Sequence, residues 1–245
     1  MPSKALSAGT LICLGANRIV MTKQATLGPI DPSLNGPLAP QVPGGPPNQR
    51  VSVSVEAVQG FLDVAQKGLN ITEQGALAAV WTSLSHQIHP LVLGQIYRTR
   101  QQIRSLATKL LSYQEATAEK TANIVSFLCS ESGSHDHTIN RREARELGLV
   151  VENPDDDFYA ILKALNANIV ETLSLRTPFN PDTMLAGQPQ VNYRAARALI
   201  ESTVHGSHQF ISEGSLSRVN IAGPNGVPQI GISDDRTSEG WRKEA

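Results

Sequence analysis

Apolar residues recur every three or four positions through the middle of the chain, which predicts a series of amphipathic helices. The first covers Val51–Lys67, with Ser52 or Ser54 as its candidate N-cap. Thr72 is the candidate N-cap of a second helix, which runs through Trp81. Further segments with the same periodicity predict three more helices: Pro90–Tyr113, Glu115–Leu128 and Asp155–Leu173.

The two ends of the chain lack this long helical periodicity. Residues 1–27 are small and apolar, and they predict a short helix over Ala8–Ala16 followed by a strand over Arg18–Met21. Residues 28–50 are so rich in proline and glycine that neither a helix nor an interior strand can continue through them, which predicts a long loop. Toward the C-terminus the pattern predicts two short strands and then a flexible tail: Gln209–Ile211, Leu216–Val219 and residues 222–245.

Composition narrows the class of protein. The 245 residues are 40% hydrophobic, and a formal net charge of −1 gives no electrostatic reason to expect nucleic acid as a partner. The two cysteines, Cys13 and Cys129, lie too far apart in sequence for a disulfide framework or a cysteine-based zinc module. Each is expected to be buried and reduced, which favours a cytoplasmic location. The apolar stretch Leu11–Met21 is too short and too polar to span a membrane, and no signal peptide is recognisable.

Three short motifs carry side chains suited to catalysis. Ser7 precedes small residues at the start of a predicted helix, a position that fits either a nucleophile or an ordinary N-cap. Asp31 lies between two prolines, which suits a carboxylate that orients another group and is also common in turns. His135 and His137 bracket Asp136, an arrangement compatible with a metal cluster or with a general base beside a carboxylate.

The segment that follows these histidines predicts a short helix with both of its ends marked. Asn140 and Glu143 have the spacing of a capping box, in which the first residue caps the helix and the second reaches back to it. Gly148 has the position of the glycine that ends such a helix.

Taken in order, these motifs resemble those of the serine dehydrogenase proteinase family, a distant relative of the Clp protease proteolytic subunit and of signal peptide peptidase A. The likeness extends over roughly residues 2–150 of the chain. The segments that carry it are Ser7–Met21, Leu27–Pro32, His89–Gly94, Gln102–Leu111, Gly133–His137 and Arg142–Leu149.

The resemblance implies an α/β fold of the Clp/crotonase type, in which ββα units wind into a spiral. The fold would be helix-rich and incomplete at its N-terminus. The peptidase domain would cover residues 1–175, followed by a C-terminal extension over residues 176–221 and the flexible tail over residues 222–245. Relatives assemble into rings or other oligomers, so a homo-oligomer is expected. Peptides or proteins would be the substrates, and no cofactor, metal, nucleic acid or membrane span is expected.

The resemblance also assigns roles to the candidate residues. Ser7 would be the nucleophile, His135 the general base and Asp31 the carboxylate that orients the base. A neutral imidazole must take the serine proton during attack and return it to the leaving amine. Three alternatives stay open: His137 as the base, Asp136 as the carboxylate, and Lys67 as the base of a Ser–Lys dyad.

One departure from the resembled family affects the expected activity. In that family the nucleophile follows a strand–helix–strand block whose Gly-Gly turn supplies the oxyanion hole, whereas Ser7 is the seventh residue of this chain. We therefore expect an N-terminally truncated member. It would be either a serine endopeptidase weakened by loss of that block, or a non-catalytic remnant that serves as an oligomerisation or binding module.

Overall fold

The computed structural model describes the chain except for residues 47, 115, 132–136, 223–227 and 245. The fold is mixed α/β, as the sequence predicts, and it divides into two units, Met1–Tyr159 and Ala160–Ala245. The boundary lies within α7 (Asp156–Thr172), earlier than the predicted boundary after residue 175.

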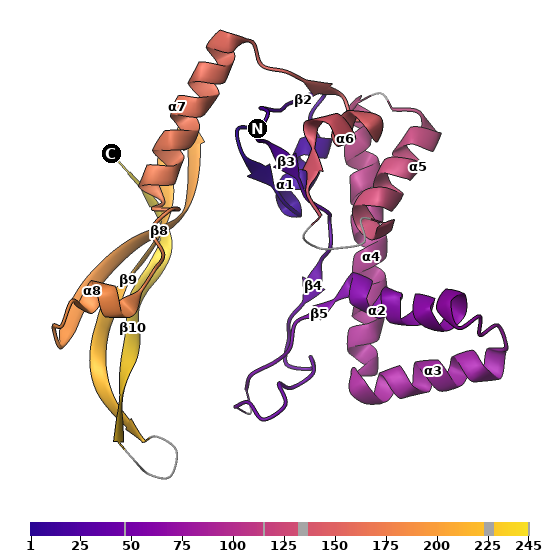
Figure 1. Ribbon diagram of the computed structural model, residues 1–245, viewed down its shortest axis with the longest axis horizontal. Coiled ribbons are helices and arrows are strands. Elements are labelled where there is room, and N and C mark those ends of the chain that lie inside the picture. The colour runs from indigo at the N-terminus through magenta and orange to yellow at the C-terminus, as the bar shows by residue number, and fades with distance from the viewer. Residues whose placement is uncertain (47, 115, 132–136, 223–227, 245) are drawn as a thin grey trace. The chain divides into compact units, whose positions relative to one another are not determined.

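Helices dominate the first unit, and the longest of them, α4, contacts α1, α2 and α5 (Figure 1). Short turns of other helix types extend three of these helices: α2 and α5 each continue into one π-helical turn, and α4 continues into a 3₁₀ turn. The helices are α1 (Ala8–Leu14), α2 (Val55–Asp63, then Val64–Gly68), α3 (Gln74–Gln87), α4 (Pro90–Leu111, then Ser112–Gln114), α5 (Ala118–Ser126, then Phe127–Glu131) and α6 (Arg141–Glu146).

Among the described residues of the first unit, each strand is two residues long, and the strands form three small sheets. In the largest sheet β1 pairs in parallel with β3, and β3 pairs antiparallel with β6. β2 and β7 form a parallel pair, and β4 and β5 form an antiparallel pair inside and just beyond the proline-rich segment. The bounds are β1 (Lys4–Ala5), β2 (Ile19–Val20), β3 (Thr26–Leu27), β4 (Ser33–Leu34), β5 (Val53–Ser54), β6 (Ile139–Asn140) and β7 (Val151–Glu152).

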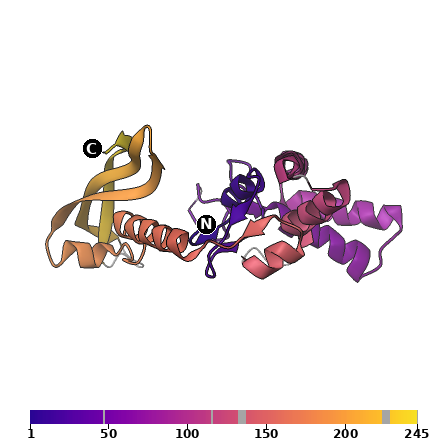
Figure 2. The ribbon, with the colours of Figure 1, turned by 90° about the horizontal axis from the view of Figure 1, so that it is seen from above.

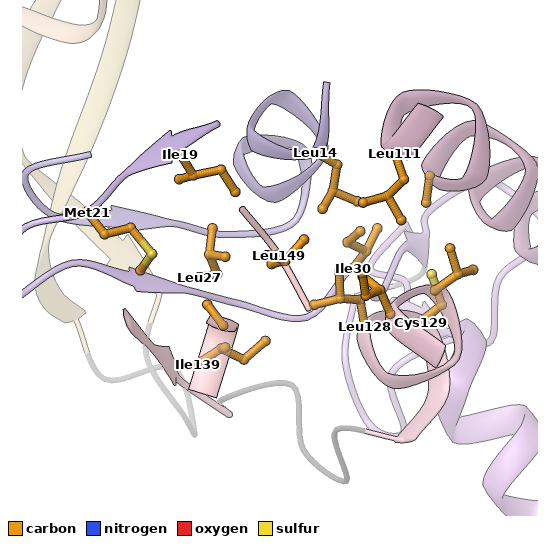
Figure 3. Close-up of a cluster of buried hydrophobic side chains, with 14 of the residues drawn as sticks. Leu14, Ile19, Met21, Leu27, Ile30, Leu111, Leu128, Cys129, Ile139 and Leu149 are labelled. Carbon is orange, nitrogen blue, oxygen red and sulfur yellow. The ribbon is translucent and has the colours of Figure 1, made fainter. Parts of the chain in front are cut away.

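The described side chains of the first unit form two hydrophobic clusters, and α4 contributes to both. The larger cluster joins α1, the strands around β3, the C-terminal half of α4 and the end of α5 (Figure 3). The second packs α2 and α3 against the N-terminal half of α4. Fully buried side chains of the larger cluster include Leu14, Leu27, Ile30, Leu111, Leu128 and Ile139.

The second unit is built on three long antiparallel strands in the order β10–β9–β8, which Figures 1 and 2 show as a bent and twisted sheet. Its core is small: Leu185, Tyr193 and Leu216 are buried together. The elements are α8 (Pro181–Leu185), β8 (Gln190–Ser202), β9 (Gly206–Ala222) and β10 (Pro228–Lys243).

This sheet corrects two expectations about the C-terminal region. The two predicted short strands are parts of one strand, β9, which continues through Gly214. The predicted flexible tail over residues 222–245 contains β10, which pairs with β9 along its length. Its glycines and charged residues are tolerated because β10 is an edge strand with no buried residue, so its side chains do not have to fill a core.

The helix starts agree with the sequence where a capping side chain is unambiguous. Ser54 caps α2 by accepting a hydrogen bond from the Ala57 N–H. The expectation for α3 was wrong by one residue, because Glu73 rather than Thr72 accepts hydrogen bonds from the first N–H groups of that helix. A carboxylate of glutamate reaches these N–H groups through its longer side chain and also opposes the positive end of the helix dipole.

The cap of α6 gives a stability prediction. Asn140 Oδ1 accepts hydrogen bonds from Arg142 N (2.9 Å) and Glu143 N (3.1 Å), two N–H groups that have no partner within the helix. We expect Asn140→Ala to lower the free energy of unfolding by about 0.5–2 kcal/mol, measured by urea denaturation. Asn140→Asp keeps an acceptor at the same place and should stay close to the native value, so equal losses in the two variants would contradict the capping role.

Candidate active site

The β1–β3–β6 sheet brings one described residue of each sequence motif, Ser7, Asp31 and His137, to the same end of its strands. β1 and β3 run parallel, so the residues that follow them, Ser7 and Asp31, leave the sheet at the same end. β6 runs antiparallel to β3, so His137, which precedes β6, approaches the sheet at that end as well. Two backbone hydrogen bonds join the first two motifs directly: Gly28 N to Ala5 O (2.9 Å) and Ser7 N to Pro29 O (3.3 Å).

Ser7 occupies the turn between β1 and α1 in a backbone conformation that is rare for a residue with a side chain. Its φ is 47° and its ψ is −106°, outside the left-handed helical region that non-glycine residues occasionally adopt. An ordinary N-cap has extended φ and ψ angles and accepts a hydrogen bond from the first turn, and Ser7 does neither. Within the described part of the chain, its hydroxyl makes no hydrogen bond. The N-cap interpretation of Ser7 is therefore wrong.

Thr10 and Gly28 hold this strained turn in place. The buried Thr10 hydroxyl lies 2.9 Å from Ala5 O and 2.7 Å from Gly28 O, so it links the ends of β1 and β3. A Cβ at Gly28 would lie 2.5 Å from Cδ2 of the exposed Leu6 side chain and 3.5 Å from its Cα, so a larger residue there would require the Leu6 side chain to move. Threonine in this role was not predicted, since an apolar helix can carry a threonine for many reasons.

Asp31 is held by the start of α2. The Ser54 hydroxyl donates to the Asp31 carboxylate, at 3.1 Å from Oδ2 and 3.3 Å from Oδ1, while it also caps α2. Ile30 N donates to Leu128 O (2.8 Å), which fixes the backbone before Asp31 against the end of α5. The sequence did not identify Ser54 as a partner of Asp31, because the long proline-rich segment separates them.

Glu56 adds a second carboxylate close to Asp31. Burial raises the pKa of Glu56, the Arg100 guanidinium 3.6 Å away opposes this shift, and the negative charge of Asp31 raises the pKa further. Arg100 also donates to Gln59 Oε1 (2.8 Å). Asp31 therefore lies at the rim of a half-buried network of opposite charges that spans α2 and α4.

His137 is engaged by a carboxylate, but not by Asp31. Its Nε2 lies 2.8 Å from Glu143 Oε1, and its ring packs edge-on against Phe127. Glu143 was predicted to complete a capping box with Asn140; the Asn140 half of the box is present, while the Glu143 carboxylate contacts the histidine. His135 and Asp136, the other candidates in this motif, lie outside the described residues.

The described residues do not form a complete triad. Ser7, Asp31 and His137 emerge at one edge of the sheet, but among the described side chains no hydrogen bond joins the Ser7 hydroxyl to either of the other two. Lys67, the candidate for a Ser–Lys dyad, is exposed and paired with Asp63 at 2.9 Å. Within the described ranges no group of histidine, cysteine, aspartate and glutamate side chains could hold a metal ion, and no helix is long and apolar enough to cross a membrane.

The two cysteines differ in their surroundings, and Cys129 lies near the charged residues Glu56, Arg100 and Arg104. Both are free, in agreement with the sequence. Cys129 is buried as predicted, and burial raises its thiol pKa to about 11, so it is protonated at neutral pH. Cys13 is only partly buried, contrary to expectation, and its Sγ lies 3.2 Å from the Met1 sulfur.

Comparison with known proteins gives one relative. The chain is 26% identical over 164 residues to an uncharacterized protein from Methanocaldococcus jannaschii, and the alignment covers 66% of this chain and 46% of the relative. The chain thus spans about half the length of the curated relative that it matches. No family model and no solved structure matches the chain.

Proposed function

We propose that the chain carries the nucleophile of a serine peptidase of the Clp/crotonase type, with Ser7 as that nucleophile. The observation that supports this most directly is the conformation of Ser7. A strained, non-glycine residue at a sharp strand-to-helix turn is the arrangement that exposes a nucleophilic serine in other hydrolases. Strain of this kind costs about 1–3 kcal/mol and persists only where the surroundings impose it; here the Thr10 hydroxyl contacts Ala5 O and Gly28 O at the ends of β1 and β3.

The proposed reaction is acyl transfer from a peptide to Ser7 and then to water. Ser7 Oγ bonds to the scissile carbonyl carbon and gives its proton to a general base, which passes that proton to the leaving amine as the C–N bond breaks. Water then attacks the acyl-serine ester and gives a proton to the base. The base passes this proton to Ser7 Oγ as the ester bond breaks, which restores the free serine. The nucleophile would come from the residues after β1, the orienting carboxylate from those after β3 and the base from those before β6.

Asp31 is proposed as the carboxylate that orients the base. Its position two residues after Pro29, whose carbonyl accepts from Ser7 N, supports this role. The Ser54 hydroxyl and the α2 start restrict the orientation of its carboxylate. The identity of the base stays a prediction: His135 is carried over from the resemblance, and His137 approaches the same sheet edge with its Nε2 occupied by Glu143.

Covalent labelling tests the proposal on the whole chain. A fluorophosphonate probe bonds to a serine only when the serine is activated as a nucleophile, so the adduct identifies the residue. We expect peptide mapping by mass spectrometry to place the adduct on Ser7. A chain that stays unlabelled, or one labelled equally before and after denaturation, would overturn the hydrolase proposal and leave the non-catalytic module as the better description.

A further inference from the structure

His137 and Glu143 form a contact that the proposed mechanism does not use. The Nε2 of His137 lies 2.8 Å from Glu143 Oε1, and the two side chains are 34% and 27% exposed, so the contact is half-buried. Because an ionised carboxylate can only accept, Nε2 carries the proton of this hydrogen bond. The His137 ring also packs edge-on against Phe127, with the ring centres 5.8 Å apart. His137 is therefore held between the end of α5 and the first turn of α6.

Both partners of His137 are themselves fixed by the rest of the first unit. Phe127 packs against the larger hydrophobic cluster. Glu143 lies in α6, whose start is capped by Asn140 and whose next residue, Ala144, is fully buried in the same cluster. Among the described side chains, the Glu143 carboxylate contacts only His137. The hydrogen bond and the ring contact thus attach His137 to two elements that the cluster holds in place.

The position of His137 matters because of its neighbours along the chain. The resemblance assigns the general base to His135, which lies outside the described residues. Only two peptide units separate His135 from His137, and two extended units span about 7 Å at most. On the other side of His137, Ile139 pairs with Leu27 of β3, the strand that leads to Asp31. His137 therefore lies between the proposed base and the sheet that carries the other site residues.

We propose that His137 and Glu143 are a positioning pair, whose hydrogen bond fixes the backbone from which the general base reaches Ser7. The inference rests on the function proposed for Ser7. Among the described side chains no hydrogen bond joins His137 to Ser7, which favours positioning over direct proton transfer by His137. A misplacement of about 1 Å can lower the rate of a reaction by about 10²-fold, so loss of the pair should slow the chemistry without removing the base.

Rates of fluorophosphonate labelling test the pair on the whole chain. His137→Phe keeps an aromatic ring beside Phe127 but cannot donate to Glu143, and Glu143→Ala removes the acceptor. We expect each change to lower the second-order rate constant for labelling of Ser7 by about 10–100-fold. Because both changes break the same hydrogen bond, the double variant should be no slower than the slower single variant. Glu146→Ala changes an exposed carboxylate three residues further along α6 and should label like the parent.

A conservative variant separates positioning from proton transfer. His137→Gln places a side-chain N–H near the position of Nε2, so it can still donate to Glu143, but an amide cannot act as a base at neutral pH. Positioning therefore predicts that His137→Gln recovers most of the rate that His137→Phe loses. Labelling should also still rise with pH as the base loses its proton. If His137 were the base, His137→Gln would be as slow as His137→Phe, and the rise with pH would disappear.

The outcomes distinguish this inference from the function on which it rests. A parent chain that is not labelled at Ser7 overturns both. A labelled parent overturns the positioning pair alone if His137→Phe and Glu143→Ala label at the parent rate, if their losses add in the double variant, or if His137→Gln loses the pH dependence. Urea unfolding of every variant controls for folding. Where one single variant does not fold, the other decides, because each breaks the same hydrogen bond.

Discussion

Ser7→Ala is expected to abolish fluorophosphonate labelling of the chain and to lower any hydrolysis of peptide or ester substrates by about 10⁶-fold, as in other hydrolases that lose their serine nucleophile. The physical reason is that no other group can form the acyl-enzyme bond at the β1–α1 turn, so the reaction loses its covalent route. Labelling intensity and the rate of substrate hydrolysis measure the effect, and the alanine variant should fold as the parent does.

Two further variants separate chemistry from structure. Ser3→Ala removes an exposed hydroxyl from the residue just before β1 and should leave labelling unchanged. Ser7→Gly removes the nucleophile and relieves the strain of a positive φ, so it should stabilise the chain by about 1 kcal/mol while abolishing labelling. A glycine variant that is less stable than the parent would show that the Ser7 conformation is not strained, and it would remove the main support for the nucleophile.

Much of the helical part of the fold could be predicted from the sequence, because helix signals are local. Pro90 begins α4, Asn140 caps α6, and Gly148 follows α6 with a φ of +100°, each at the predicted place. The helix ends were less accurate. α2 was predicted to reach Lys67, whereas it ends at Asp63 and continues as a π turn. Such a turn depends on packing against neighbouring helices and has no signature in the chain itself.

The C-terminal sheet could not be predicted for a different reason. The segment that forms β8, Gln190–Ser202, contains three alanines and two arginines, residues that favour strands weakly, and β10 is rich in charge. These segments become strands because each pairs with β9, its neighbour along the chain, and the propensity of one segment does not reveal the partner strand that it pairs with. The composition of residues 222–245 therefore predicted a flexible tail, whereas pairing with β9 makes most of this segment a strand.

In the candidate site, too, local motifs could be predicted from the sequence, whereas contacts between separate segments could not. The three motifs could be found in the sequence, and the sheet brings Ser7, Asp31 and His137 to the same end of its strands. Their partners could not be found: Ser54 contacts Asp31 across the proline-rich segment, and Glu143 contacts His137 instead of completing a cap. Side-chain pairing follows from the course of the backbone, which a short motif does not specify. For this reason the sequence leaves open whether His135 or His137 is the base and whether Asp31 or Asp136 is the carboxylate.

Leu128→Ala is expected to lower the free energy of unfolding of the first unit by about 2–5 kcal/mol. Leu128 is fully buried where the end of α5 meets β3 and α4 (Figure 3), and its carbonyl accepts from Ile30 N just before Asp31. Removing its side chain leaves a cavity in the cluster that carries the site. Exposed Leu91 provides the matched control, since Leu91→Ala should change stability by less than about 0.5 kcal/mol.

Tryptophan fluorescence can separate the two units in this experiment, because Trp81 lies in the first unit and Trp241 in the second. In a Trp241→Phe background, urea unfolding followed through Trp81 should shift to lower urea when Leu128→Ala is added. In a Trp81→Phe background, the Trp241 transition should keep its midpoint, because the second unit has its own core around Leu185. Equal shifts of both transitions would mean that the two units unfold as one, and a loss below about 1 kcal/mol would contradict the role of Leu128 in the core.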